Sequence, residues 1–300
     1  MAAYKMKRRG PLERRTPFDY VNYAILAGIT LACVIPVLHV VWASFSDPAR
    51  LAQNPGMVWF PQGFTLKGYE LVLTNRGIAL GYANTIFYVA VTTSLNILMT
   101  ALGAFVCSRR QAMLARPITF MITFTMFFGG GLIPFYLTVK RLGLTDTRWA
   151  MILPSAVSAW NIIIMRTSMA GLPDSLEESA KIDGANDCVI LFRIIMPLIK
   201  AVTAVMVLFY AVGHWNSWFN AMIFLRRRSL YPLQLILREI LITNDTSQIV
   251  QIANANNDSN LYKILVKYCA TVVATAPILC IYPFLQRYFV KGVMIGSLKG

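Results

Sequence analysis

The stretch Glu178–Pro197, ESAKIDGANDCVILFRIIMP, lies between two apolar segments, 149–168 and 201–224. Each flanking segment has about the 20 residues that a helix needs to cross the hydrocarbon core of a membrane. The stretch between them carries acids, an amide and a glycine, and it is too long for a simple turn. We therefore predict a membrane protein in which a structured connection, 174–197, projects from the lipid.

This connection contains the signals for two short helices. Asp174 or Ser175 can cap a first helix, whose first turn then carries acids, as the helix dipole favours. Gly184 interrupts that helix, and Asn186 or Asp187 can cap a second one, which the proline at the end of the stretch stops. Two interpretations remain open at this point: an amphipathic hairpin that seals the base of a bundle, or a docking element for a soluble partner.

The composition indicates lipid as the solvent. The chain has 300 residues, of which 57% are hydrophobic and 14% charged, whereas soluble domains carry about 25% charged residues. The net charge of +15 comes from basic residues that flank apolar runs, which favours control of topology over binding of nucleic acid. The five cysteines form no C-x-x-C pair, so we predict neither a disulfide nor a metal site.

Six segments have the length of a membrane span, and the sequence predicts an all-α, polytopic bundle of six spans. Gly129-Gly130-Gly131 and Pro134 are expected to kink or unwind the third span, either for packing or to line a pathway. The predicted spans are 21–45, 82–106, 117–139, 149–168, 201–224 and 264–288.

Basic residues set the expected orientation, because cytoplasmic loops are enriched in Lys and Arg. The segment 1–20 is predicted to be a cytoplasmic tail, since it carries Lys5, Lys7, Arg8, Arg9, Arg14 and Arg15. With six spans, the connection 174–197 and a C-terminal tail, 289–300, are cytoplasmic as well. The transmembrane domain is expected to extend over 21–288.

Three segments, 46–81, 140–148 and 225–263, are then expected on the outer side. Within the last, Tyr231–Ile242 is apolar but too short to span, so it should lie at the interface or pack on the bundle mouth. The same segment begins with the triplet Arg226, Arg227 and Arg228. The triplet is either solvated charge or a contact for an acidic binding protein, or else an electrostatic funnel for an anionic sugar.

The stretch around Gly184 also carries a family pattern. Residues 178–185, ESAKIDGA, followed by Phe192 and by Met196-Pro197-Leu198, resemble the E-A-A loop of binding-protein-dependent ABC importer permeases. Ser179 and Met196 depart from that pattern only by small changes of shape. The resemblance implies a coupling hairpin in which apolar anchors, polar rim contacts and a glycine bend engage an ATPase subunit. The residues expected there are Glu178, Ala180, Asp183, Gly184, Leu191, Phe192 and Pro197.

Further matches run along most of the chain and are similar to carbohydrate importer permeases related to the maltose system. They lie at 127–136, 144–154, 215–218 and 286–300, and the first is similar to the branch that handles complex oligosaccharides, anionic uronates such as alginate among them. The resemblance implies a multi-pass subunit of the bacterial cytoplasmic (inner) membrane. Its implied partners are a second homologous permease, two ATP-binding-cassette subunits that bind ATP and Mg²⁺, and an extracytoplasmic solute-binding protein.

Aromatic and amide residues of the fourth and fifth spans are candidates for the substrate pathway. Aromatic faces pack on the C–H surfaces of sugars, and amides hydrogen-bond their hydroxyls. The alternative is that these side chains pack between helices or form an interfacial belt. The candidates are Trp160, Asn161, His214, Trp215, Asn216 and Trp218.

An ion-coupled secondary transporter is the main alternative function. Such transporters often carry ionisable residues inside their spans, and the predicted spans have no Asp, Glu, Lys or Arg away from their ends. No paired carboxylates, metal-spaced His/Cys set, nucleophile motif or phosphate-binding Gly-x-x-x-x-Gly-Lys-Ser/Thr loop is present either. We therefore predict a non-catalytic transport subunit that binds no cofactor of its own and receives energy through contact with a partner.

Overall fold

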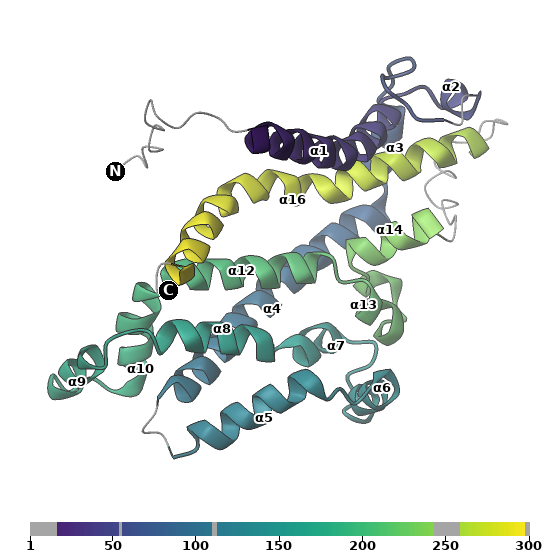
Figure 1. Ribbon diagram of the computed structural model, residues 1–300. Helices are drawn as coiled ribbons and strands as arrows, with labels where there is room; N and C mark the ends of the chain where they lie inside the picture. Colours follow the sequence, from purple (N-terminus) through teal and green to yellow (C-terminus); the bar gives the residue numbers. More distant parts are fainter. Residues whose placement is uncertain (1–16, 54–55, 110–112, 243–258, 298–300) are drawn as a thin grey trace.

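The computed structural model describes residues 17–53, 56–109, 113–242 and 259–297, and every regular element in these residues is a helix (Figure 1). The elements are α1 Pro17–Ser44, α2 Pro48–Gln53, α3 Lys67–Thr74, α4 Arg76–Ser108, α5 Ala115–Phe127, α6 Leu132–Arg141, α7 Trp149–Ile152, η1 Leu153–Ser155, α8 Ala159–Met169, α9 Ser175–Ile182, α10 Asp187–Val189, η2 Ile190–Ile195, α11 Met196–Leu198, α12 Lys200–Trp215, α13 Phe219–Phe224, η3 Arg228–Leu230, α14 Leu233–Ile242 and α16 Ser259–Ser297.

The long helix α4 is the centre of the bundle. Helices α8 and α12 pack along it, and α14 and α5 also contact it. Its buried face is small and polar, with Asn84, Asn96, Thr100, Ala101 and Ala104 all buried. Small side chains let helix backbones approach closely in lipid, where helix association depends on close packing and interhelical hydrogen bonds.

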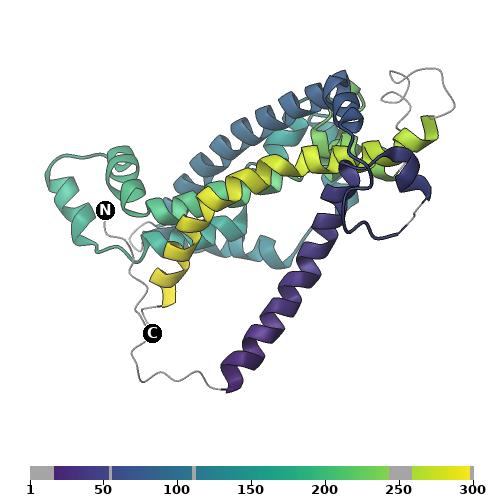
Figure 2. The same ribbon diagram turned by 90° about the horizontal axis from the view of Figure 1, so that it is seen from above.

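Helix α1 lies at the edge of the molecule, where its C-terminal part contacts α16 and its N-terminal part diverges from α16 (Figures 1 and 2). Only Ala43 and Ser44 of this helix are buried, whereas Leu26, Ile29 and Leu31 are each more than half exposed. A continuous apolar surface of this size is not stable in water. The surface of α1 therefore requires lipid or another protein against it.

Three of the described helices are long and apolar enough to cross a membrane: α1, α4 and the part of α16 from Tyr262 to Ile281. Two bent helix pairs raise the number to five if each pair counts as one span. The prediction of six spans is therefore only partly matched, because three of the predicted segments contain a break, which was expected for the third alone.

The predicted third span, 117–139, is divided into α5 and α6. Helix α5 ends at Phe127 and α6 begins at Leu132. Between them Gly131 has a φ of 81°, a conformation that glycine adopts at little steric cost. The interruption expected at the glycine cluster is confirmed, but it separates two short helices and does not merely kink one span.

The predicted fourth and fifth spans contain breaks that the hydropathy pattern did not indicate. The chain bends by 47° between the α7–η1 segment and α8, where Pro154 lies in η1 and the Ser158 side chain accepts a hydrogen bond from the backbone N–H of Asn161. Helix α12 ends at Trp215 rather than near 224, and α13 begins at Phe219. Ser158 caps α8, whereas no side-chain cap begins α13; a few polar residues or a proline barely change the mean hydropathy of an apolar run.

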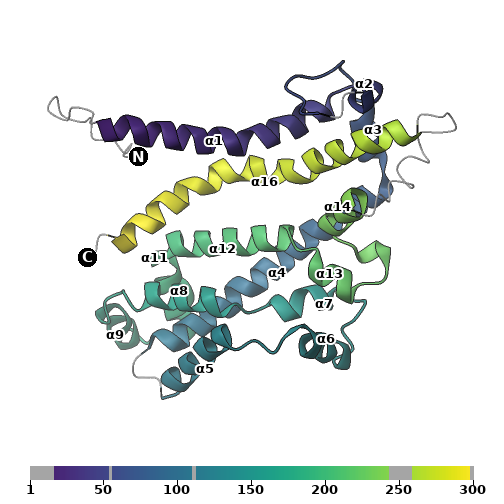
Figure 3. The same ribbon diagram turned by 45° about the vertical axis from the view of Figure 1, so that its right-hand side comes forward.

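Helix α1 begins and α16 ends at the same end of the molecule as α9 and α10, which we call the hairpin end (Figures 1 and 3). Helix α16 runs to Ser297, so most of the predicted C-terminal tail, 289–300, is helical. Most of the predicted tail 1–20 lies outside the described residues, as does 243–258.

Helices α2, α6, α13 and α14 lie at the other end, which we call the loop end. As expected for Tyr231–Ile242, α14 packs on the bundle: its Leu233, Ile236 and Ile240 are buried together with Trp215 and Leu265.

Candidate functional site

At the hairpin end, α9 and the continuous α10–η2–α11 segment form two arms joined by a tight turn. The N–H of Ala185 donates to the carbonyl of Ala180 at 2.9 Å, and the N–H of Gly184 donates to that of Lys181 at 3.0 Å. This pair of bonds is the Schellman motif, which places one residue in the left-handed conformation. That residue is Gly184, with a φ of 78°, so the predicted break at Gly184 is confirmed.

The second arm begins as predicted and ends one residue later than predicted. The side chain of Asn186 accepts a hydrogen bond from the N–H of Val189 at 2.9 Å, which confirms it as the cap. Asp174 precedes α9 but makes no capping side-chain bond. Pro197 lies inside α11, and the chain turns by 88° into α12 only after Leu198. Because proline lacks an N–H, one carbonyl of the preceding turn loses its usual donor, and this turn is a π-helix.

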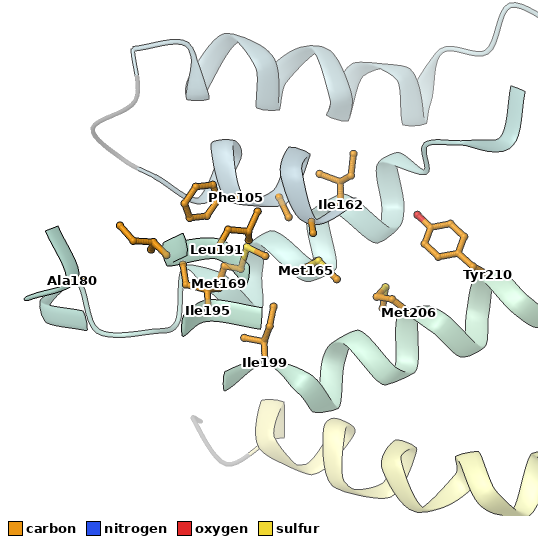
Figure 4. Packing of buried hydrophobic residues seen from close by; sticks show 13 residues of the cluster. Phe105, Ile162, Met165, Met169, Ala180, Leu191, Ile195, Ile199, Met206 and Tyr210 are labelled. Carbon is orange, nitrogen blue, oxygen red and sulfur yellow. The ribbon is translucent and has the colours of Figure 1, made fainter. Parts of the chain in front are cut away.

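Some of the residues in the family pattern are buried and others are exposed. Ala180 and Leu191 are 7% and 1% exposed and belong to the chain's own core, packed with Ile195, Met165 and Phe105 (Figure 4). The expectation that Leu191 anchors a partner is therefore wrong for this structure, since its side chain is already covered. Its role is to fix the second arm to α4 and α8.

The apolar side chains that the hairpin exposes are others. Phe192 is 44% exposed and Ile182 is 86% exposed, and Glu178, Asp183 and Gly184 are exposed as well. Ile182, at the end of α9, is therefore open to contact with another molecule. Ile182 had not been predicted as a contact residue, although it lies inside the family pattern.

One arginine connects both arms to the bundle. Arg109, at the end of α4, lies 3.1 Å from a carboxylate oxygen of Glu177 on α9 and 2.8 Å from one of Asp187 on α10. Its guanidinium carbon also lies 3.9 Å from the ring centroid of Phe105. Between α9 and the ends of α4 and α8 there is a cleft of about 570 Å³, lined by Arg109, Glu177 and other residues of these helices. The hairpin therefore stands away from the bundle but is held by charge at both arms.

The six candidates for the substrate pathway do not form one site. Trp215 is buried and donates its indole N–H to the carbonyl of Ala274, and Asn161 is buried on α8. For these two residues the structure agrees with the packing interpretation. Trp160, Asn216 and Trp218 are exposed.

His214 belongs to a polar network inside the bundle. Its Nε2 lies 2.6 Å from Oδ1 of Asn96, and the amide nitrogen of Asn96 donates to the carbonyl of Ser155. Tyr210, whose ring stacks with His214, shares a hydrogen bond with Thr100. The network links α4 and α12 to the bend between η1 and α8.

At the loop end, two of the three predicted outer arginines have carboxylate partners. Arg227 Nε lies 2.9 Å from Asp146 Oδ2, and Arg228 Nη2 lies 2.8 Å from Glu239 Oε2. The backbone N–H groups of Arg227 and Arg226 also donate to Asp146, and these bonds, followed by the Arg227 side chain, lower the pKa of the Asp146 carboxyl. The positive charge available to an anionic ligand is therefore smaller than the triplet suggests.

Three residues with clear structural roles were missed in the sequence. Arg109 and Asp146 are charged residues in short loops, and their partners are 78 and 81 positions away along the chain. Asn96 is an amide in the middle of a span, and that signal was visible. Among the described residues, no group of three or more His, Cys, Asp or Glu side chains is placed to hold a metal ion.

Known proteins place this geometry in a family. No protein-family model matches the chain. The polygalacturonan/rhamnogalacturonan transport system permease protein YtcP of Bacillus subtilis (strain 168) is 38% identical over 283 residues, which cover 94% of this chain and 98% of YtcP. Protein LplC of the same strain is 38% identical over 288 residues, which cover 94% and 95% of the two chains.

A solved structure agrees with these relatives. The crystal structure of a bacterial ABC transporter involved in the import of the acidic polysaccharide alginate contains a chain with a TM-score of 0.83 and 31% identity. The match covers 91% of this chain and 96% of that one. Fold and sequence thus define the membrane-spanning subunit of an ABC importer.

The chain belongs to the permease subunits of carbohydrate ABC importers. Such subunits are non-catalytic inner-membrane proteins, and the ATPase of the importer lies in partner subunits. The resemblance inferred from the E-A-A pattern is confirmed, and these relatives give no support for an ion-coupled transporter.

Proposed function

We propose that the chain is one of two homologous permeases that together form the pathway of an importer for acidic oligosaccharides. The substrate class comes from the relatives: YtcP is named for polygalacturonan and rhamnogalacturonan, and the solved importer for alginate. These polymers share uronate sugars, each with a carboxylate. A solute-binding protein would deliver the oligosaccharide on the outer side, and two ATPase subunits, which bind ATP and Mg²⁺, would drive its release inside.

We further propose six spans, with α5 and α6 forming an interrupted third span and α12 with α13 a fifth. The 88° angle between α11 and α12 speaks against one straight span through both. Helix α12 has 16 residues, about 24 Å at 1.5 Å per residue, and α13 supplies the remaining length. The hairpin end, with the segments 1–20 and 289–300, would then be cytoplasmic, and the domain would extend over 21–288.

The observation that carries the coupling role is the exposed surface of a hairpin that the bundle holds in place. Glu178, Asp183, Ile182 and Phe192 are exposed, while the other side of the same hairpin is buried against α4 and α8. An apolar centre with a polar rim is the usual anatomy of a protein interface. Closure of the ATPase subunits on ATP would push this surface and move α8 and α12, which continue directly into it.

Charge and backbone changes on the hairpin test this role. Glu178→Lys places a cation where a carboxylate faces the partner, and Gly184→Asp puts a side chain on a residue with a φ of 78°, at a cost of about 1–2 kcal/mol. Either variant should lower ATP-driven uptake by about tenfold or more, equivalent to about 1.4 kcal/mol or more of lost coupling. The measurement is uptake of an acidic oligosaccharide into proteoliposomes that contain the assembled transporter and its binding protein.

Glu70→Lys is the matched control, because Glu70 is an exposed acid on α3 at the loop end. This variant should still co-purify with the ATPase subunits in wild-type amounts. Full transport and full ATPase stimulation in both hairpin variants would refute the coupling role. Uptake of acidic oligosaccharide that does not depend on ATP would refute the importer itself.

A further inference from the structure

Arg238 on α14 has a buried donor for which the described residues supply no acceptor. Its Nε is inaccessible to solvent and makes no hydrogen bond in the part of the chain that the structure describes. The residue lies between the buried Leu235 and Ile240 in sequence, on a helix that packs on α4, α13 and α16. A buried charged donor normally has a hydrogen-bonding partner, since burying it alone is costly.

Two carboxylates at this end of the molecule are paired with other arginines. Asp146 binds Arg227, and Glu239, the next residue after Arg238, binds Arg228. No ion pair of Arg238 is found among the described residues. Arg227 and Arg228 are each neutralised by a carboxylate of the chain. The described residues supply no such carboxylate to Arg238.

Arg238 makes a contact with Trp218. The guanidinium carbon lies 4.8 Å from the centroid of the Trp218 ring, within the range of a cation–π interaction. Trp218 itself is 38% exposed, so part of its ring is open to another molecule. A tryptophan face packs on the C–H surface of a pyranose, and a guanidinium binds a carboxylate with two parallel hydrogen bonds. Together they match the two chemical features of a uronate sugar.

The position of the pair is also suitable for a pathway. Trp218 follows Asn216 in the break between α12 and α13, and α14 lies beside α13 at the loop end (Figures 1 and 3). Non-helical backbone at membrane depth is tolerated where it is buried in protein or lines a water-filled cavity. Asn216 and Trp218 are exposed in this break, so their side chains are open to a molecule that passes between this chain and a second permease.

We propose that Arg238, with Trp218 beside it, binds the carboxylate of a uronate residue and makes the pathway selective for acidic over neutral sugars. The inference rests on the proposed import function and adds a specificity-determining residue to it. Arg226, Arg227 and Arg228, which the sequence made the obvious candidates, would contribute less, because two of them are bound to carboxylates of the chain.

The test is binding of free sugar to the assembled, detergent-solubilised transporter without the binding protein, so that this protein's own preference does not enter. The probes are trigalacturonate and its fully methyl-esterified form, which keeps the sugar rings and lacks the charge. Calorimetry should show that the wild type binds the acid about tenfold or more tightly than the ester, as one lost charge-paired contact implies. Arg238→Gln should remove this difference while affinity for the ester changes less than about twofold.

Arg141→Gln is the matched control, because Arg141 is an exposed arginine at the end of α6, and it should keep the wild-type preference. Arg238→Lys keeps the charge but lacks the planar fork, so it should retain part of the preference, and it replaces Arg238→Gln if that variant does not assemble. Equal binding of acid and ester by the wild type, no binding of either probe, or an unchanged preference in the Arg238 variants would overturn the proposal.

Transport distinguishes this proposal from the function on which it rests. ATP-driven uptake of trigalacturonate that is the same in wild type and in the Arg238 variants would overturn the role of Arg238 and leave the importer intact. Absence of ATP-driven uptake of the acid in the wild type would overturn both.

Discussion

At the scale of single residues, Asp146 shows how one carboxylate can organise a loop. Its φ is 59°, a left-handed conformation that Asp and Asn adopt more readily than most residues. From there its side chain accepts hydrogen bonds from the backbone N–H groups of Arg226 and Arg227 at 3.0 and 2.9 Å. The link ties the loop after α6 to the loop after α13.

We predict that Asp146→Asn lowers the melting temperature of the assembled transporter at neutral pH. The hydrogen bonds from Arg227 and Arg226 lower the pKa of this carboxyl in the folded state, below its ordinary value of 3.8. A group with a lowered pKa stabilises the fold at pH values above the ordinary pKa, and loses this effect as the pH falls through the lowered one. The difference between wild type and variant should therefore be constant above about pH 5 and shrink below pH 4.

Scanning calorimetry across this pH range measures the effect. Glu70→Gln, which removes the charge of an exposed acid on α3, should leave the melting temperature unchanged. A difference for Asp146→Asn that stays constant down to pH 3 would show that its charge does not hold the loop.

At the scale of elements, Arg109 decides how firmly the hairpin is held. The side chain is 18% exposed, and its two partners, Glu177 and Asp187, are 26% and 65% exposed. We predict that Arg109→Gln weakens the attachment of both arms by about 1–2 kcal/mol, since a half-buried charged bond contributes more than the 0–1 kcal/mol of a surface pair. Hydrogen exchange should then become faster in α9 and α10 and stay the same in α12.

Arg109→Lys is the informative companion variant. Lysine keeps the charge but presents no planar fork, so one arm should regain protection and the other should not. Equal exchange in wild type and Arg109→Gln would mean that the buried Leu191 and Ile195 suffice to hold the hairpin.

The positions of the long helices could be predicted from the sequence better than the breaks within the spans or the pairs of residues that contact each other. The break at Gly184 is predicted correctly, and Asn186 is one of the two predicted caps, because a left-handed glycine and an N-terminal cap are local signals that need no tertiary contact. Leu191 was assigned to the wrong side of its helix, because an apolar residue reads the same whether it faces its own core or a partner. Arg109 and Arg238 became visible only in three dimensions, where the partner, or its absence, is defined by distant helices.

The membrane spans show the same contrast between strong local signals and weak ones. Helices α1 and α4 match their predicted spans to within a few residues, since long uniform hydropathy is a strong signal. The break after Trp215 depends on polar residues at 216 and 217 within an apolar run, and a window of average hydropathy conceals it. Trp218, one of the two residues proposed to bind the substrate, lies in this break.

At the scale of the whole molecule, the proposed orientation puts the hairpin on the cytoplasmic face of the membrane and the Arg238 site on the outer face. Cys188 lies on α10 and is exposed, while Cys107 and Cys269 are buried. Cys33 and Cys280 are exposed on α1 and α16, where the proposed topology puts lipid. A thiol reacts with water-borne reagents through its thiolate, so Cys188 is the native reporter of the hairpin end.

We predict that a membrane-impermeant maleimide labels Cys188 in inside-out vesicles and fails to label it in intact cells. The opposite pattern is expected for Glu70→Cys in a Cys188→Ser background, because Glu70 is exposed at the loop end. Labelling of Cys188 should also fall when the ATPase subunits are bound, since the proposed interface covers the hairpin. If Cys188 is labelled from the cytoplasmic side and the ATPase protects it, one measurement links the orientation of the chain to coupling. Labelling of Cys188 in intact cells would reverse the proposed topology, and with it the assignment of the hairpin and of the Arg238 site to their faces of the membrane.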